Sequence, residues 1–303
     1  MSRLYGASFL AFLSLGLPLG AVAAPLTVID DTHERVQLAA PPERIVSLAP
    51  GTTEMLFLAG AGNHGIATVD FSDDPPAARA VPRIGDSNAI DLERLILLHP
   101  DVVVVWPGGN NPAQIAQIAA LGFPLYRQQL DSLADLGPSL RRLGMLAGTR
   151  AGADAAAERL ERQLADLRRE FASRARVRVL LQVWDHPLYT IGGKQLLSDA
   201  LRLCGAENIF DDLSVPGPAV TLEAVVARDP AAIVAAAPAS SAREWLSDWR
   251  RFPHLRAVRA DNLIVFEDQR LTRLGPSILP ATRALCGVIE QARVRAQSLK
   301  LLN

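Results

Sequence analysis

The sequence is poor in the residues and motifs that usually carry catalysis or metal binding. Its 303 residues include only two cysteines and five histidines, and the histidines are scattered without the spacing of a metal site. The serine-hydrolase motif G-x-S-x-G and the Walker A phosphate loop are absent. We therefore expect neither an enzyme nor a resident metal or cofactor, and a binding function is favoured.

A strong charge of one sign is also missing. The chain has 31 basic and 32 acidic residues, for a net charge of -1. This balance gives no electrostatic reason to expect nucleic acid or an anionic membrane as a partner. Hydrophobic residues make up 49% of the chain, which is enough for large buried cores.

A long apolar run occurs only at the N-terminus. Arg3 is followed by an apolar stretch at residues 9–19 and by small residues ending at Ala24. The stretch is shorter than the roughly 20 residues of a spanning helix, so it is typical of a secretory signal peptide rather than a membrane anchor. We predict that residues 1–24 are a signal peptide, and that the protein is periplasmic and not inserted in a membrane.

The two cysteines, Cys204 and Cys286, lie 82 positions apart in the exported part of the chain. An even number of cysteines in an oxidising compartment favours a disulfide. A bridge over a loop of that length would stabilise the fold by about 4 kcal/mol. Two separate buried thiols are the alternative.

Short apolar runs alternate with helical patterns along the rest of the chain. The runs lack polar alternation, as in parallel strands that are covered on both faces, and they occupy residues 45–49, 101–105, 176–183, 233–234 and 263–266. This order predicts an α/β fold with parallel sheets. After the first run a helix is expected, with Thr52 or Thr53 as its N-cap.

Residues 151–172 differ from both strand series. They contain no proline, and apolar residues recur at helical spacing, which predicts one helix of about 33 Å. We interpret this helix as a rigid connector between two α/β lobes, with an ordinary surface helix as the alternative. The predicted division is an N-terminal lobe at residues 25–147, an inter-lobe helix at 148–174 and a C-terminal lobe at 175–303.

A weak internal repeat supports the two lobes. Glu93 and Glu223 each stand seven residues before a proline that precedes a strand-like run, and Asp91 and Thr221 are placed to cap the two helices. Acidic residues in a first helical turn are favoured by the helix dipole alone. The functional alternative is that each lobe presents one exposed carboxylate to a two-fold partner.

Aromatic residues follow two of the predicted strands, although only 5% of the chain is aromatic. Trp106 precedes Gly108 and Gly109 after one strand, and Trp184 and Tyr189 follow another. The carboxyl ends of parallel strands are where α/β proteins bind ligands, so these rings predict a stacking cleft. Packing of each ring in a core is the alternative.

Several short motifs, taken together in their order and spacing, resemble a known family, the helical-backbone periplasmic binding proteins for iron-siderophores, haem and vitamin B12. The match runs from residue 44 to the C-terminus. Its motifs are R-I-V-S-L-A-P at residues 44–50, Thr53-Glu54, F-S-D at 71–73, Leu92-Glu93-Arg94, Trp106 with G-G-N at 108–110, Gly193-Lys194, C-G-A-E-N-I-F at 204–210, and Gly275-Pro276.

The resemblance implies two Rossmann-like lobes with parallel sheets joined by one long backbone helix, and a ligand held between the lobes. Within the family the vitamin B12 binders are most similar, which implies a corrinoid as the transported ligand, an ABC transporter permease dimer as partner, and a monomeric receptor. Haem or an iron-siderophore is the alternative ligand, and an exported enzyme is the alternative of another class.

The resemblance also carries individual residues. It implies that Glu93 and Glu223 dock on the permease and that Cys204 pairs with Cys286. The ligand contacts that it implies, together with those expected from the strand-end aromatic segments, are Phe71, Trp106, Gly108, Gly109, Trp184, Tyr189, Gln269, Arg270, Leu271, Thr272 and Arg273. The chain departs from the vitamin B12 binders at Phe71 (tyrosine there), Ser87 and Gly217 (tryptophans there) and Gln269 (aspartate there), which leaves a less aromatic cleft.

Overall fold

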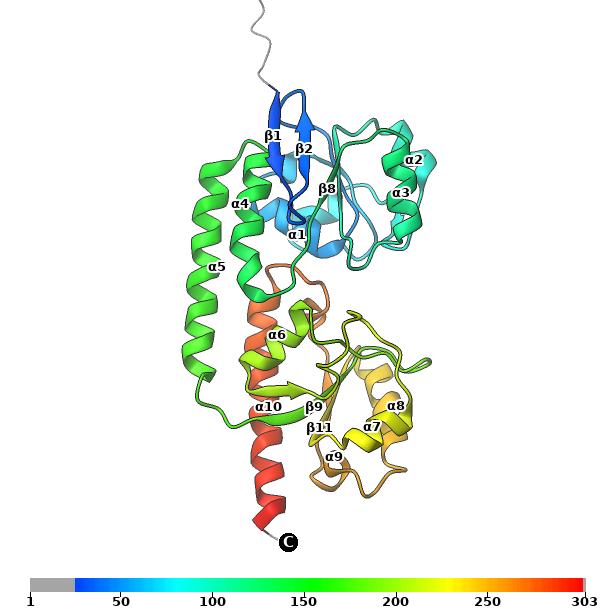
Figure 1. Ribbon diagram of the computed structural model, residues 1–303, viewed down its shortest axis with the longest axis vertical. Helices are drawn as coiled ribbons and strands as arrows, with labels where there is room; N and C mark the ends of the chain where they lie inside the picture. The colour runs from blue at the N-terminus through cyan, green and yellow to red at the C-terminus, as the bar shows by residue number, and fades with distance from the viewer. Residues whose placement is uncertain (1–24, 302–303) are drawn as a thin grey trace, which may run out of the picture.

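The computed structural model describes residues 25–301, and it consists of two α/β lobes stacked along the long axis of the molecule (Figure 1). The N-terminal lobe contains a four-stranded parallel sheet of order β4-β3-β7-β8. Its strands are β3 (Ile45–Ser47), β4 (Gly65–Ala67), β7 (Val102–Val105) and β8 (Leu125–Arg127). All four valines of β7 are fully buried, as expected for a central strand covered on both faces.

Helices and short strands surround this sheet. The helices are α1 (Pro50–Leu58), α2 (Leu92–Leu97), α3 (Pro112–Ala120) and α4 (Leu136–Leu146), with short 3-10 turns η1 (Gly62–His64), η2 (Pro76–Ala80) and η3 (Leu133–Asp135). Two small antiparallel pairs complete the lobe: β1 (Leu26–Ile29) with β2 (Arg35–Leu38), and β5 (Gly85–Asp86) with β6 (Ala89–Ile90).

The C-terminal lobe repeats the design. Its parallel sheet has the order β10-β9-β11-β12, built from β9 (Val177–Gln182), β10 (Ala206–Asn208), β11 (Ala232–Ala236) and β12 (Leu263–Phe266). Its helices are α6 (Leu196–Leu203), α7 (Leu222–Arg228), α8 (Ala239–Trp249) and α9 (Arg256–Arg259), with the turn η4 (Gln269–Leu271) and the final helix α10 (Ile278–Leu301). The predicted fold class, two α/β lobes with parallel sheets, is confirmed.

The long connector is α5 (Arg150–Phe171), a single helix of 22 residues along one side of the molecule (Figure 1). Its alanines and leucines at helical spacing are buried, while its arginines and glutamates face outward. The prediction of one long helix between the lobes is therefore confirmed.

The chain crosses between the lobes a second time, which the sequence did not predict. After β12 it runs back to the N-terminal lobe and returns through α10 (Figure 1). There the backbone N–H and the hydroxyl of Ser277 donate to the two carboxylate oxygens of Glu54, at 2.6 and 2.8 Å. A Cβ on Gly51 would lie 2.3 Å from the Arg273 carbonyl oxygen, and one on Gly275 would lie 3.0 Å from Gly51 Cα, so both glycines permit this close approach.

The start of α1 differs from the prediction. Pro50 is its first residue and Ala49 its N-cap, with no side-chain cap, so the expected capping by Thr52 or Thr53 is wrong. Proline suits a first helical position because its missing N–H would have no intrahelical partner there. The Thr53 hydroxyl instead contacts the hydroxyls of Thr68 and Ser47, at 2.6 and 2.9 Å, inside the lobe.

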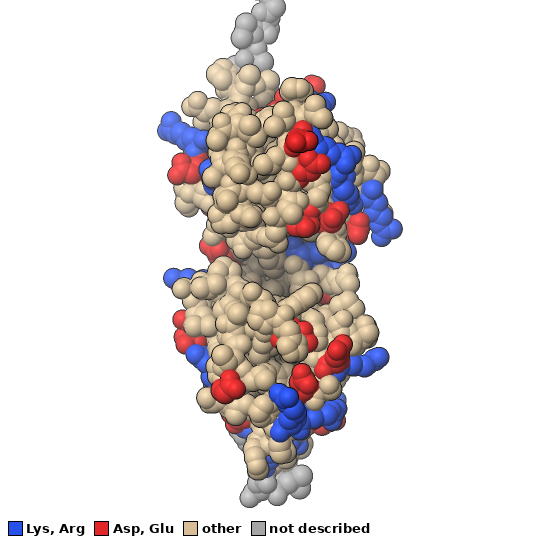
Figure 2. All heavy atoms as spheres, turned by 90° about the vertical axis from the view of Figure 1, so that its right-hand side faces the viewer, with Lys and Arg blue, Asp and Glu red and all other residues tan. Residues whose placement is uncertain are grey.

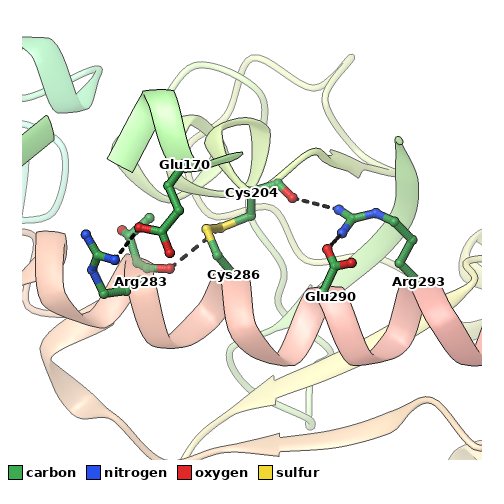
Figure 3. The surroundings of a disulfide bond; sticks show 7 residues. Glu170, Cys204, Arg283, Cys286, Glu290 and Arg293 are labelled. Atoms are coloured by element: carbon green, nitrogen blue, oxygen red, sulfur yellow. Dashed lines mark hydrogen bonds and ion pairs between the residues drawn. A yellow bond between two sulfur atoms is a disulfide. The ribbon is translucent and has the colours of Figure 1, made fainter. Parts of the chain in front are cut away.

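The two cysteines are bonded, so the predicted disulfide is confirmed. Cys204 at the end of α6 is joined to Cys286 on α10, and ion pairs of Arg283 with Glu170 and of Arg293 with Glu290 flank the bridge (Figure 3). The Cys204 carbonyl also accepts from the Arg293 guanidinium at 2.8 Å. The disulfide and this hydrogen bond attach α10 to the C-terminal lobe, and the ion pair of Arg283 with Glu170 attaches it to α5.

The predicted signal peptide, residues 1–24, lies outside the described residues. Between residues 25 and 301, no helix combines the length and the apolar character that crossing a bilayer requires.

Candidate functional site

A cleft of about 530 Å³ lies between the two lobes, and Figure 2 shows it as a groove across the middle of the molecule. Its volume falls within the ~300–1,000 Å³ of small-molecule sites. Residues that follow the carboxyl ends of strands in both sheets form much of its wall, the position at which open α/β sheets bind ligands. The lining residues are Pro50, Phe71, Asp73, Ser87, Asn88, Trp106, Trp184, Ala236, Ala237, Pro238, Phe266, Glu267, Asp268, Gln269, Thr272 and Arg273.

Four aromatic residues from both lobes line this cleft; Phe266, at the end of β12, is buried, and the other three rings are at least partly exposed. Phe71 and Trp106 come from the N-terminal lobe and Trp184 from the C-terminal lobe. Phe71 is 75% exposed and Trp184 56% exposed, unusual values for rings that gain free energy by burial. Phe71 also has a φ of +64°, a conformation that costs a bulky residue about 1 kcal/mol or more. An exposed ring held in a strained turn indicates a surface kept for contact with a ligand.

The turn after β7 is shaped around the Trp106 indole. A Cβ on Gly109 would lie 1.9 Å from Cζ3 of that ring, and one on Gly108 would lie 2.9 Å from its Nε1. The backbone N–H of Trp106 donates to the buried Asn110 side chain at 2.6 Å. Asn110 in turn donates to the carbonyls of Leu48 and Ser87 at 2.7 and 2.8 Å, so it fixes the turn to β3 and to the cleft wall. Asn110 was not predicted as a site residue, although the G-G-N sequence contains it.

Substituting Gly109 by alanine is expected to weaken ligand binding about tenfold, because the new methyl group must push the Trp106 ring out of its place. Calorimetric titration of the cleft ligand measures the loss. Gly152→Ala is the matched control, since a Cβ there meets no atom within 4 Å. An equal affinity for Gly109→Ala and the control would show that the Trp106 ring does not contact the ligand.

On the opposite wall, Trp184 packs against Trp245 with ring centroids 5.9 Å apart. Tyr189 pairs through its backbone with Trp184 and Ala219, and it does not line the cleft. The predicted aromatic segment therefore brings one of its two rings to the cleft, while Tyr189 supports the loop that carries the other.

In the loop after β12, too, only some of the predicted residues line the cleft. Gln269, Thr272 and Arg273 line the cleft, whereas Leu271 is fully buried in the main core and anchors the loop there. Arg270 is exposed, and its guanidinium donates to Asp268 at 2.6 and 2.8 Å. This contact holds the pKa of the Asp268 carboxyl below its usual range.

Other lining residues were missed by sequence reasoning. Ala236, Ala237 and Pro238 follow β11, and Glu267 and Asp268 follow β12. Like Trp106 and Trp184, these residues follow the carboxyl ends of parallel strands. Small and acidic residues gave no aromatic signal there, so nothing in the pattern singled them out.

Carboxylates outnumber basic groups along the cleft. Asp73, Glu267 and Asp268 line it, against a single guanidinium, that of Arg273. Arg273 also forms an ion pair with Asp74 at 3.2 Å, which joins the returning segment to the N-terminal lobe. The cleft is therefore poorly suited to a strongly anionic ligand.

Glu54 does not line this cleft; it lies at the contact between α1 and the returning segment. Its side chain is buried, and this burial raises the pKa of the carboxyl to about 7; hydrogen bonds from Ser277 and the charge of Arg273 act in the opposite direction, and Asp74 adds to the rise. The folded protein therefore binds this proton more tightly than the unfolded chain. Between pH 4.5 and 7 this group's contribution to stability falls as the pH rises.

Glu54→Gln removes this titration and keeps a side chain that can bond with Ser277. Above pH 7 the variant is expected to be more stable than the parent by roughly 3 kcal/mol, and the difference should shrink as the pH falls toward 4.5. Urea unfolding of both proteins across this range measures the difference. Glu34→Gln, on an exposed turn, is the control; a difference that does not vary with pH would contradict the assignment to Glu54.

Glu93 and Glu223 occupy equivalent places in the two lobes. Each is exposed in the first turn of a short helix, α2 or α7, and both helices lie on the same side of the molecule (Figure 1). The caps are as predicted: Asp91 accepts from a backbone N–H of α2 at 2.9 Å, and Thr221 from one of α7 at 3.2 Å. Neither glutamate lines the cleft, so any role that they have is separate from ligand contact.

The sequence profile described as periplasmic binding protein matches residues 45–269, which include most of both lobes and the helix between them. The chain belongs to this family.

Residues 60–65 have the pattern G-x-G-x-x-G, which is found in dinucleotide-binding sites. Here, however, they follow helix α1 and lead into strand β4, the reverse of the strand-to-helix order of such a site.

Individual periplasmic binding proteins are similar over most of the chain. The vitamin B12-binding protein of Vibrio cholerae serotype O1 is 31% identical over 253 residues, which are 84% of this chain and 91% of the relative. That of Photorhabdus laumondii is 33% identical over 249 residues, or 82% and 88% of the two chains. The predicted resemblance to the vitamin B12 binders is thus confirmed.

Solved structures agree on the fold. The periplasmic vitamin B12-binding protein of Vibrio cholerae superposes with a TM-score of 0.75 at 31% identity, covering 84% of this chain and 98% of that one. A periplasmic haem-binding protein from Roseiflexus superposes with a TM-score of 0.69 at 22% identity, covering 82% and 98%. The second comparison shows the shared fold alone.

Proposed function

We propose that this periplasmic binding protein captures a corrinoid, of the vitamin B12 type, in the inter-lobe cleft and delivers it to an ABC transporter permease. The observation that carries the proposal is the set of three rings, Phe71, Trp106 and Trp184, that face one cleft from both lobes. Flat aromatic faces suit a large and partly apolar macrocycle. The similarity to relatives named vitamin B12-binding proteins supports the same ligand.

The composition of the cleft favours a corrinoid over haem. Proteins hold haem iron through histidine, cysteine, methionine or tyrosine. None of these residue types occurs among the described residues that line the cleft. The cobalt of a vitamin B12-type corrinoid carries its axial ligands within the molecule, so it needs no such side chain.

An iron-siderophore is disfavoured by charge. Siderophores are anionic and call for several basic groups, whereas the cleft presents three carboxylates and one guanidinium, that of Arg273. The five histidines do not form a metal site either: among residues 25–301 there is no group of three or more histidine, cysteine, aspartate or glutamate side chains that could hold a metal ion.

The partner and compartment form part of the same proposal. In this proposal Glu93 and Glu223, one from each lobe of a monomeric receptor, dock on basic groups of a permease dimer, and their exposed positions in the first turns of α2 and α7 support it. The signal-peptide pattern of residues 1–24 and the disulfide fit an oxidising periplasm. We also propose that the chain divides into an N-terminal lobe at residues 25–147, a connector at 148–174 and a C-terminal lobe at 175–303.

Titration with cyanocobalamin tests the ligand directly. Calorimetry is expected to give a dissociation constant below the micromolar range, and Trp184→Ala should weaken binding about tenfold by removing one exposed ring. Leu97→Ala is the matched control, since that side chain is also exposed but lies outside the cleft. Absence of heat with cyanocobalamin, together with binding of haem, would replace the corrinoid by haem.

A further inference from the structure

A second cavity lies at the opposite edge of the C-terminal sheet, and nothing in the proposed function uses it. It has a volume of about 520 Å³ and sits beside the amino-terminal ends of β9 and β11, between α9 and the last turns of α10. The inter-lobe cleft faces the carboxyl ends of the same strands. Since β9 has six residues at about 3.3 Å each, the two cavities are separated by about 20 Å.

Arginine is the only charged residue type among the described residues that line this cavity. The five arginines come from three separate elements, and the remaining wall is largely apolar. The lining residues are Ala175, Arg176, Val177, Arg178, Ala231, Arg256, Arg259, Ala260, Arg293, Ala296, Gln297 and Leu299.

Three of the arginines have acidic partners outside the cavity. Arg256 pairs with Asp229 at 2.8 Å, Arg178 lies 3.6 Å from Glu207, and Arg293 contacts Glu290. These contacts neutralise their charges in part and fix their positions.

The other two arginines, Arg176 and Arg259, are exposed, and their guanidinium groups form no ion pair or hydrogen bond with any described residue. They leave a local surplus of two positive charges at the mouth of the cavity.

We propose that this basal cavity binds a phosphate group, as a free phosphate compound or as the head group of a lipid. A phosphate monoester carries nearly two negative charges at neutral pH, which matches the surplus of Arg176 and Arg259. Guanidinium groups bind phosphate through paired N–H donors. The alanine and valine wall accommodates a small apolar part of the same molecule. The proposal does not depend on the ligand of the inter-lobe cleft.

Titration of the full chain with pyrophosphate tests the free form, and co-sedimentation with vesicles that contain phosphatidic acid, whose head group is a phosphate monoester, compared with phosphatidylcholine vesicles, tests the lipid form. Arg176→Ala/Arg259→Ala is expected to weaken binding at least about tenfold in whichever arm shows it. The control is Arg159→Ala/Arg162→Ala, which removes the same charge from exposed positions of α5.

Binding that falls in the cavity variant alone supports the proposal, and the responding arm identifies the source of the phosphate. No binding in either arm, or equal losses in the two variants, would overturn it. If the cavity variant fails to fold by circular dichroism, the unchanged protein still decides: specific binding must weaken as the salt concentration rises and must be displaced by inorganic phosphate. Binding that withstands both would also overturn the proposal.

Discussion

Replacing Glu93 and Glu223 together by alanine is expected to reduce corrinoid uptake to near background while corrinoid affinity in solution stays unchanged. Both carboxylates are exposed, stand in the first turns of α2 and α7, and lie outside the cleft. Hydrogen bonds from its own backbone N–H and from Thr221 lower the pKa of Glu223, so its charge is kept at every physiological pH. Charge-assisted contacts at two separated points fix both affinity and orientation, so each single variant should lose about tenfold in permease affinity.

The measurements separate docking from ligand capture. Uptake is assayed with permease in reconstituted vesicles, and corrinoid affinity is measured by calorimetry on the isolated receptor. Glu34→Ala/Glu158→Ala is the matched control, because both glutamates are exposed and neither lies on α2 or α7. Equal losses of uptake in the two double variants, or a parallel loss of corrinoid affinity, would contradict the docking role.

Removing the disulfide is expected to lower the free energy of unfolding by about 4 kcal/mol. The bridge between Cys204 and Cys286 closes a loop of 82 positions, and its loss gives the unfolded chain much more freedom. The effect should appear as a lower urea midpoint both for reduced parent protein and for Cys204→Ala/Cys286→Ala. Both cysteines are buried, so the double variant also loses a little packing in the core.

To control for other effects of the reductant, the double variant is treated with it as well, and its urea midpoint should not change. Thiol labelling of the unfolded, unreduced parent is expected to find no reactive cysteine, since residues 25–301 contain no free one. An unchanged midpoint after complete reduction of the parent would show that the bridge contributes no stability.

Local patterns predicted much of this fold. The valine-rich run at residues 101–105 became the buried strand β7, and the apolar spacing of residues 151–172 became α5 with ends one residue away. The strands β4, β8 and β10 were missed, as were the paired strands β1, β2, β5 and β6, because so few residues carry too little periodicity to distinguish a strand from a loop. β3 is equally short but was found, since it lies within a longer apolar run at residues 45–49. The expected cap of α1 was wrong because Thr53 bonds with Thr68 from another part of the chain, which no local pattern contains.

The residues of the cleft could likewise be predicted only in part from the local sequence. Trp106 and Trp184 were found because each follows a strand, and strand ends meet at a known edge of the sheet. Tyr189 and Leu271 were also predicted to contact the ligand, but neither lines the cleft. Tyr189 pairs through its backbone with Trp184 and Ala219, and Leu271 packs in the main hydrophobic core. Whether a side chain near a strand end faces the cleft depends on its neighbours in three dimensions, which spacing alone does not specify.

The return of the chain to α1 has a consequence for how the protein is made. The face of α1 that carries Gly51 and Glu54 is covered by residues 273–277, which are synthesised after both sheets. Until then this face of α1 is open to water, and the Glu54 carboxylate lacks its hydrogen bonds from Ser277. A fragment truncated after the N-terminal lobe would therefore lack the contact that buries Glu54 in the whole protein.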